Sequence, residues 1–162
     1  MRVVSTGKRR RILDFDIENR PSTYWYGDAT TAEITAIAWQ WIGEDSPVEV
    51  SLLGVDGDRP SDLLEAFLPE YNQADLVTGH YIRRHDLPIV NAHCMEANLP
   101  LLKSVETQDT KMDLAKTGGM PMSQEALGAM LRLEAPKVQM NHWRWRAANR
   151  LDAEGIELTR ER

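Results

Sequence analysis

The chain has 162 residues, a length that suits one globular domain with a sizeable core. Its formal charge of −6 excludes a protein that holds nucleic acid by bulk electrostatics alone. The longest apolar-rich stretch, residues 34–42, is too short to span a bilayer, and no apolar segment follows the basic residues near the start. We therefore expect neither a membrane protein nor a secretory signal.

Three strands are predicted in the first third of the chain. Residues 11–18 alternate in part between apolar and acidic side chains, as a strand does. After a predicted loop at residues 21–31, residues 33–42 are dense in β-branched and aromatic side chains, which favours a second strand. A turn at residues 43–47 leads to a third strand at residues 48–53. Short turns between consecutive strands are typical of an antiparallel meander.

After Pro60 the spacing of the apolar residues changes to that of a helix. Ser61 is the predicted N-cap, and an apolar stripe follows at Leu63, Leu64, Phe67 and Leu68. Residues 76–79 form a short apolar run, which we expect to be a central strand. Pro88 is expected to open the next helix, whose N-cap would then be Leu87.

The remaining elements complete one mixed α/β domain that spans residues 1–162. Residues 105–109 are a candidate fifth strand, and apolar residues at 126–131 trace a further helical face. Asp152 is a plausible N-cap for a last helix that runs to Arg162. We see no internal repeat and no flexible linker in this chain.

Asp16 and Glu18 stand two residues apart on the first predicted strand, so their side chains leave the same face of the sheet. Asp14 shares this alternation near the start of the strand. Paired carboxylates on a central strand repel each other and lose solvation, so they need cations or hydrogen bonds to compensate. A divalent metal site is one hypothesis for this pair, and an acidic strand end is the other.

A second segment places Asp86 after the short strand and close to the start of a helix. Asp86 could cap that helix, but a helix opened by Pro88 would be capped by the residue directly before the proline. The Asp86 side chain is therefore free to point elsewhere.

These two segments carry a family resemblance. Residues 12–18, Ile-Leu-Asp-Phe-Asp-Ile-Glu, resemble the first motif of the DEDD family of proofreading-type 3′→5′ exonucleases. Residues 79–88, Gly-His-Tyr-Ile-Arg-Arg-His-Asp-Leu-Pro, resemble its second motif, usually Gly-His-Asn, three residues, an aromatic residue and Asp, with Pro nearby. The resemblance covers nearly the whole chain. It implies an RNase H-like α/β fold: a five-stranded mixed sheet, three antiparallel strands and then parallel additions, flanked by helices.

The chain departs from the family pattern in three places. Tyr81 stands where the family usually has Asn, and His85 stands where it usually has Phe or Tyr. The family also has a fourth carboxylate, an Asp on the last helix that follows a Tyr or His by four or five residues, and no such pattern occurs after His85. Glu157 and Glu161 are weak substitutes. We expect the chain to be truncated before this motif, with an incomplete last helix, and we assign no fourth ligand.

The resemblance implies phosphodiester hydrolysis with two Mg²⁺ or Mn²⁺ ions, which stabilise the attacking and leaving oxygens. Asp16, Glu18 and Asp86 would be the catalytic, metal-binding carboxylates. With one carboxylate missing, the second ion should bind weakly, so the activity of this chain stays open. Substrate contacts are expected from the five residues that surround these carboxylates in the two motifs, namely Ile17, His80, Tyr81, Arg84 and His85.

Other chemistry-bearing residues are fewer. No His-x-x-x-His or Cys-x-x-Cys pair occurs, which disfavours structural zinc. Trp143 and Trp145 alternate with Arg144 and Arg146, and such a segment either stacks on a single strand or anchors a helix with a solvated basic side. The single cysteine, Cys94, is expected to be buried, and it agrees with a reducing cytoplasm.

Three functions remain in competition at this stage. The first is a 3′→5′ exonuclease on single-stranded nucleic acid with a free 3′ end, DNA favoured over RNA, in replication or repair with a polymerase or replication proteins as partners. The second is a non-catalytic nucleic-acid-binding or interaction module on the same fold. The third, a junction resolvase, is disfavoured because the Gly-His…Asp-x-Pro signature belongs to the exonucleases. Fold alone does not separate them.

Overall fold

A computed structural model describes residues 9–21, 32–120, 122–134 and 137–162. Its centre is a five-stranded mixed sheet with the strand order β3-β2-β1-β4-β5. β1 pairs with β2 and β2 with β3 in antiparallel fashion, whereas β4 is parallel to both β1 and β5. The predicted mixed sheet, three antiparallel strands followed by parallel additions, is confirmed. The strands are β1 (Ile12–Pro21), β2 (Ala32–Trp41), β3 (Glu49–Leu52), β4 (Leu76–Gly79) and β5 (Glu106–Asp109).

The central strand β1 separates its side chains by chemistry. Leu13, Phe15 and Ile17 are almost fully buried. Asp14, Asp16 and Glu18 alternate with them and therefore leave the opposite face of the sheet. One strand thus supplies both the core and an acidic face.

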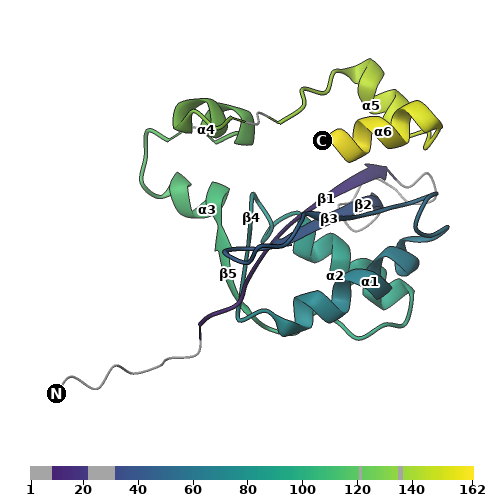
Figure 1. Cartoon of the computed structure of the whole chain (residues 1–162), viewed down its shortest axis with the longest axis horizontal. Helices are drawn as coiled ribbons and strands as arrows, with labels where there is room; N and C mark the ends of the chain where they lie inside the picture. The colour runs from purple at the N-terminus through teal and green to yellow at the C-terminus, as the bar shows by residue number, and fades with distance from the viewer. Residues whose placement is uncertain (1–8, 22–31, 121, 135–136) are drawn as a thin grey trace.

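Helices α1 (Pro60–Gln73) and α2 (Asp86–Glu96) cover the apolar face of the sheet, as Figure 1 shows. Phe67 of α1 lies 5.0 Å from the Phe15 ring and 5.7 Å from the Trp39 ring, between centroids. The buried Ile89 and Val90 of α2 belong to the same core. This packing fixes β1 in place, and with it the acidic side chains on the other face.

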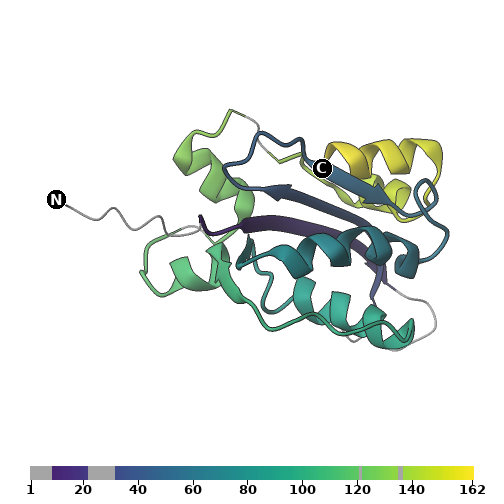
Figure 2. The same cartoon turned by 60° about the horizontal axis from the view of Figure 1, so that its bottom comes forward.

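Of the remaining helices, the three nearest the C-terminus lie on the side of the acidic face, so that the sheet separates them from α1 and α2, whereas the one that follows β5 lies at the edge of the sheet (Figures 1 and 2). Asp152 accepts a hydrogen bond from the Gly155 amide at 2.8 Å, which confirms it as the N-cap of the last helix. No helix in the described part of the chain is long and apolar enough to cross a bilayer. These helices are α3 (Thr110–Ala115), α4 (Gln124–Leu131), α5 (His142–Ala148) and α6 (Ala153–Glu161).

Two predicted helix starts were wrong, and one helix was missed. α1 begins at Pro60 with Arg59 as its N-cap, so Ser61 lies inside the first turn; the Asp62 carboxylate accepts from the Arg59 amide at 3.0 Å. α2 begins at Asp86, two residues before Pro88, and its N-cap is His85 rather than Leu87. The short helix α3 was not predicted at all. The predicted loop at residues 21–31 was wrong at Pro21, which is the last residue of β1, and residues 22–31 lie outside the described residues.

Candidate functional site: an acidic cleft

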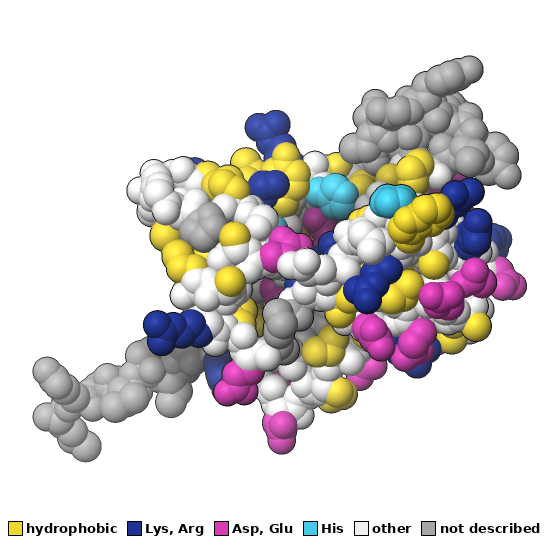
Figure 3. All heavy atoms as spheres, turned by 90° about the horizontal axis from the view of Figure 1, so that it is seen from above, with side chains coloured by type: hydrophobic (Ala, Val, Ile, Leu, Met, Phe, Trp, Pro, Cys, Tyr) yellow, Lys and Arg dark blue, Asp and Glu magenta, His cyan; other side chains and the backbone are white. Residues whose placement is uncertain are grey.

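A cleft of about 490 Å³ lies over the carboxyl-terminal half of β1. Asp16 and Glu18 enter it from β1, and Asp86 enters it from the first turn of α2. Figure 3 views the molecule from the side of α4, α5 and α6, and acidic side chains lie there in a hollow between histidine and basic side chains. The three predicted carboxylates therefore line one cavity.

The Asp86 carboxylate is nearly inaccessible, with 1 % of the residue exposed. One of its oxygens accepts a hydrogen bond from the Ile17 amide at 3.1 Å, and the other lies 3.3 Å from Nδ1 of His85. The hydrogen bond to Asp86 is the main cause that raises the pKa of His85, because it favours the protonated ring. Asp86 is thus tied to the backbone of β1 between Asp16 and Glu18, and not to its own helix.

Two cations reach the β1 carboxylates from distant parts of the chain. The Lys137 ammonium lies 3.3 Å from Asp16 and 3.9 Å from Glu18. The Arg162 guanidinium lies 2.5 Å from Glu18, and another of its nitrogens donates to the Val138 carbonyl at 3.1 Å. Only 14 % of each basic side chain is exposed, so both charges are largely removed from solvent.

Burial and the two neighbouring cations shift the pKa values of these carboxylates in opposite directions. Burial is the largest effect on Asp16 and raises its pKa, with Lys137 opposing the shift and Asp86 adding to it. The pKa of Glu18 is raised for the same reason, and Arg162 opposes that shift most strongly. The two cations therefore offset part of the effect of burial, and the net shift of both carboxyl pKa values is still upward.

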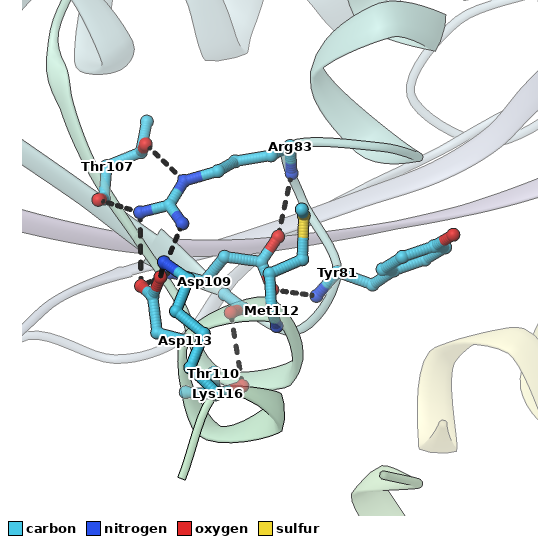
Figure 4. A network of polar contacts seen from close by, with 9 residues as sticks. Tyr81, Arg83, Thr107, Asp109, Thr110, Met112, Asp113 and Lys116 are labelled. Carbon is cyan, nitrogen blue, oxygen red and sulfur yellow. Dashed lines mark hydrogen bonds and ion pairs between the residues drawn. The ribbon is translucent and has the colours of Figure 1, made fainter.

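The loop after β4 forms another wall of the cleft, with His80, Tyr81 and His85 among its lining residues. A Cβ atom on Gly79 would come within 2.7 Å of the Phe15 carbonyl, so only glycine lets this loop pass so close to β1. The loop is also held by the buried Asp109, whose oxygens accept from the Tyr81 and Arg83 amides, both at 3.0 Å (Figure 4).

The donor set of the cleft fits a hard divalent cation by its chemistry, because such ions prefer carboxylate oxygens. Within the described residues, however, no group of three or more His, Cys, Asp or Glu side chains is gathered closely enough to hold a metal ion. Asp16 and Glu18 contact Lys137 and Arg162, and Asp86 contacts Ile17 and His85. Any divalent ion at Asp16 and Glu18 must therefore compete with these two side chains.

The predicted substrate residues divide into two groups. Ile17, His80, Tyr81 and His85 line the cleft together with the carboxylates. Arg84 is exposed and is not among the lining residues.

The C-terminal half of the chain contributes unevenly to the cleft. Trp145 lines it, and the Arg162 guanidinium lies 4.7 Å from the Trp145 ring centroid. Trp143 is 63 % exposed and lies outside the lining. Neither Glu157 nor Glu161 belongs to the lining, whereas Glu125 does.

Several lining residues were missed by the sequence reasoning. Lys111 is the second residue of α3, Gln124 and Glu125 open α4, and Lys137 and Arg162 come from the last quarter of the chain. Asp16 and Lys137 are 121 residues apart in sequence, and no motif marks the lysine. The sequence offered one signal for such a partner, namely that the acidic residues of the first strand need cations to compensate their charge.

Comparison with known proteins bears on the fold. No family model matches the chain, and no curated protein matches it either. Among solved structures, the chain is similar to the family B DNA polymerase from the hyperthermophilic archaeon Pyrobaculum calidifontis, with a TM-score of 0.68 and 14 % sequence identity. The match covers 94 % of this chain and 22 % of the polymerase chain. Together with the mixed sheet, this similarity shows that the fold is RNase H-like.

The acidic face makes stability depend on pH, and Asp14→Asn tests this. Burial first, and Asp16 second, raise the pKa of Asp14 from 3.8 to about 6. The stability that protonation contributes is therefore present at low pH and is lost as the pH rises through about 6. Asp14→Asn is expected to raise the free energy of unfolding by roughly 1–2 kcal/mol at pH 8 and to change it little near pH 4. Urea denaturation at both pH values measures this, and equal effects at the two would contradict it.

Proposed function

We propose that this chain is a 3′→5′ exonuclease unit that acts on single-stranded nucleic acid. The observation that carries the proposal is the convergence of Asp16, Glu18 and Asp86 in one cleft. The fold supports it, because the first motif lies in the central strand β1 and the second motif runs into helix α2, and these two elements bring the three carboxylates together. DNA is favoured over RNA, because the solved chain with a similar fold is a DNA polymerase.

Asp16, Glu18 and Asp86 would hold Mg²⁺ or Mn²⁺, which supplies stabilisation of charge on the attacking and leaving oxygens when bound. Asp86 contributes a fixed position, since its hydrogen bond to the Ile17 amide holds it against β1. His85 lies beside Asp86 with a raised pKa, so a protonated ring can donate a hydrogen bond to a phosphate oxygen in the cleft.

A second candidate function is a nucleic-acid-binding module without catalysis. The specific observation in its favour is that Lys137 and Arg162 neutralise Asp16 and Glu18. With the carboxylates neutralised from within, the cleft can accept a phosphate backbone without divalent ions.

One pair of measurements separates the two candidates. The first follows release of mononucleotides from a 3′-labelled single-stranded DNA oligonucleotide in Mn²⁺, with EDTA as control, and the second measures binding of the same oligonucleotide in EDTA. Release that depends on Mn²⁺ supports the exonuclease. Binding without release supports the module, and the absence of both contradicts both functions. Release of internal fragments instead of mononucleotides contradicts the exonuclease direction.

A further inference from the structure

We propose that Lys111 and Tyr81 form a nucleotide-binding subsite at the edge of the acidic cleft, with Asp109 as the residue that positions both. The proposal rests on the proposed function only in its ligand, single-stranded nucleic acid, and not on hydrolysis. Lys111 lies on α3, the helix that the sequence did not predict, and Tyr81 lies on the loop after β4. Both residues line the cleft that holds the carboxylates.

Lys111 differs from the other cations of the cleft in its partner. Its ammonium lies 3.9 Å from the centroid of the Tyr81 ring. Within the described part of the chain, no carboxylate forms an ion pair with it, whereas Lys137 and Arg162 are both engaged by carboxylates. An ammonium held by an aromatic ring keeps its charge and its three donors for an anion, and a backbone phosphate is the anion a nucleic acid offers.

Tyr81 supplies the second half of the subsite. The residue is 36 % exposed, so part of its ring remains open to the cleft. Figure 4 shows its side chain pointing away from the polar network beneath the loop. An aromatic ring beside a cation is the combination that binds single strands without sequence preference, because the ring stacks on a base and the cation contacts a phosphate.

Asp109 holds the two residues in a fixed relation. Tyr81 has a backbone φ of 72°, a conformation that non-glycine residues adopt rarely. The Tyr81 amide donates to Asp109 at 3.0 Å, and the same oxygen accepts from the Met112 amide in the first turn of α3, also at 3.0 Å. One carboxylate therefore joins the loop of Tyr81 to the helix of Lys111, as Figure 4 shows.

Three further contacts hold this junction together. Thr110 donates to the Gly79 carbonyl at 3.2 Å, and its hydroxyl lies 2.9 Å from Nδ1 of His80. Arg83 binds Asp113 of α3 at 2.6 Å. Because α3 and the loop are joined at several points, Lys111 and Tyr81 are held in a fixed position at the cleft before any ligand binds.

The test is fluorescence anisotropy with a labelled ten-nucleotide oligo-dT in EDTA over a series of salt concentrations. Lys111→Gln is expected to weaken binding about tenfold, and to lower the slope of log K against log salt by about 0.7, the contribution of one phosphate contact on a single strand. Tyr81→Leu is expected to weaken binding to a similar degree, whereas Tyr81→Phe keeps the ring and should bind normally. Lys116→Gln is the matched control, because Lys116 pairs with Asp113 outside the cleft.

Asp109→Asn tests the positioning role through a double-mutant cycle. If Asp109 acts through Lys111 and Tyr81, the Asp109→Asn substitution weakens binding on its own but adds little to the combined Lys111→Gln and Tyr81→Leu variant, since both contacts that it positions are already gone. A Lys111→Gln protein with unchanged affinity and salt slope would overturn the subsite, and so would a wild-type protein that does not bind the oligonucleotide. Additive losses would overturn the role of Asp109. Absence of hydrolysis with Lys111-dependent binding would instead contradict the exonuclease and leave the subsite intact.

Discussion

Replacing Asp16 by Asn is expected to reduce the Mn²⁺-dependent release of mononucleotides by at least about 100-fold, since even residues that only support metal ligands cost roughly 10- to 100-fold when changed. Asp16 is the β1 carboxylate between Asp86 and Lys137, and its pKa responds to both. The substitution keeps the size of the side chain and removes only its charge. The initial rate on a 3′-labelled single strand at saturating Mn²⁺ is the measurement.

Asp14→Asn is the matched control for this loss. Asp14 stands two residues earlier on the same face of β1, yet it does not line the cleft. We expect its activity to equal that of the unaltered protein. Equal losses in the two variants would show that the loss does not depend on the place of Asp16 in the cleft, and an Asp16→Asn protein with full activity would refute the catalytic assignment.

Lys137→Gln combined with Arg162→Gln is expected to tighten Mn²⁺ binding about 100-fold. Each cation occupies a carboxylate that a divalent ion would need, at 3.3 Å for Asp16 and 2.5 Å for Glu18. A charge-assisted contact of this kind contributes about 1.5 kcal/mol, and 1.4 kcal/mol corresponds to a factor of ten in affinity. Titration calorimetry with Mn²⁺ measures the change directly, without any need for activity.

The single variant Lys137→Gln, with an expected gain of about tenfold, serves if the double variant is too unstable without metal. Lys116→Gln is the control, since it removes an ion pair of similar length, 3.2 Å, on an exposed part of α3. No gain in either cleft variant would show that the cations do not compete with the ion. Weaker binding would show that they help to build its site.

The sheet and the carboxylates could be predicted because their information is local. A strand that alternates Leu13, Phe15 and Ile17 with three acids has one buried and one polar face in whatever fold it enters. The spacing of the second segment placed Asp86 near the start of a helix, and the structure puts it there. The boundaries were less exact. Pro60 and Asp62 together mark the start of α1, but Ser61, a residue type that commonly caps helices, is the N-cap that the sequence predicts instead.

The rest of the site depends on long-range packing, which no local pattern records. Lys137 and Arg162 look like ordinary surface cations in the sequence, and only the closure of the C-terminal segments over β1 makes them partners of Asp16 and Glu18. α3 escaped prediction because it has six residues and none of them is buried, so it shows no apolar stripe. Lys111 and the role of Asp109 were missed with it.

The two chemically distinct faces of β1 also constrain how the protein can fold. A slip of one residue in the pairing of β1 would turn every side chain of the strand to the other face. Asp14, Asp16 and Glu18 would then face the core at Phe67, and the Phe15 side chain would be exposed to solvent. The carboxylates of β1 thus penalise a one-residue slip, and a chain that pairs β1 in the correct register has placed Asp16 and Glu18 on the acidic face in the same step.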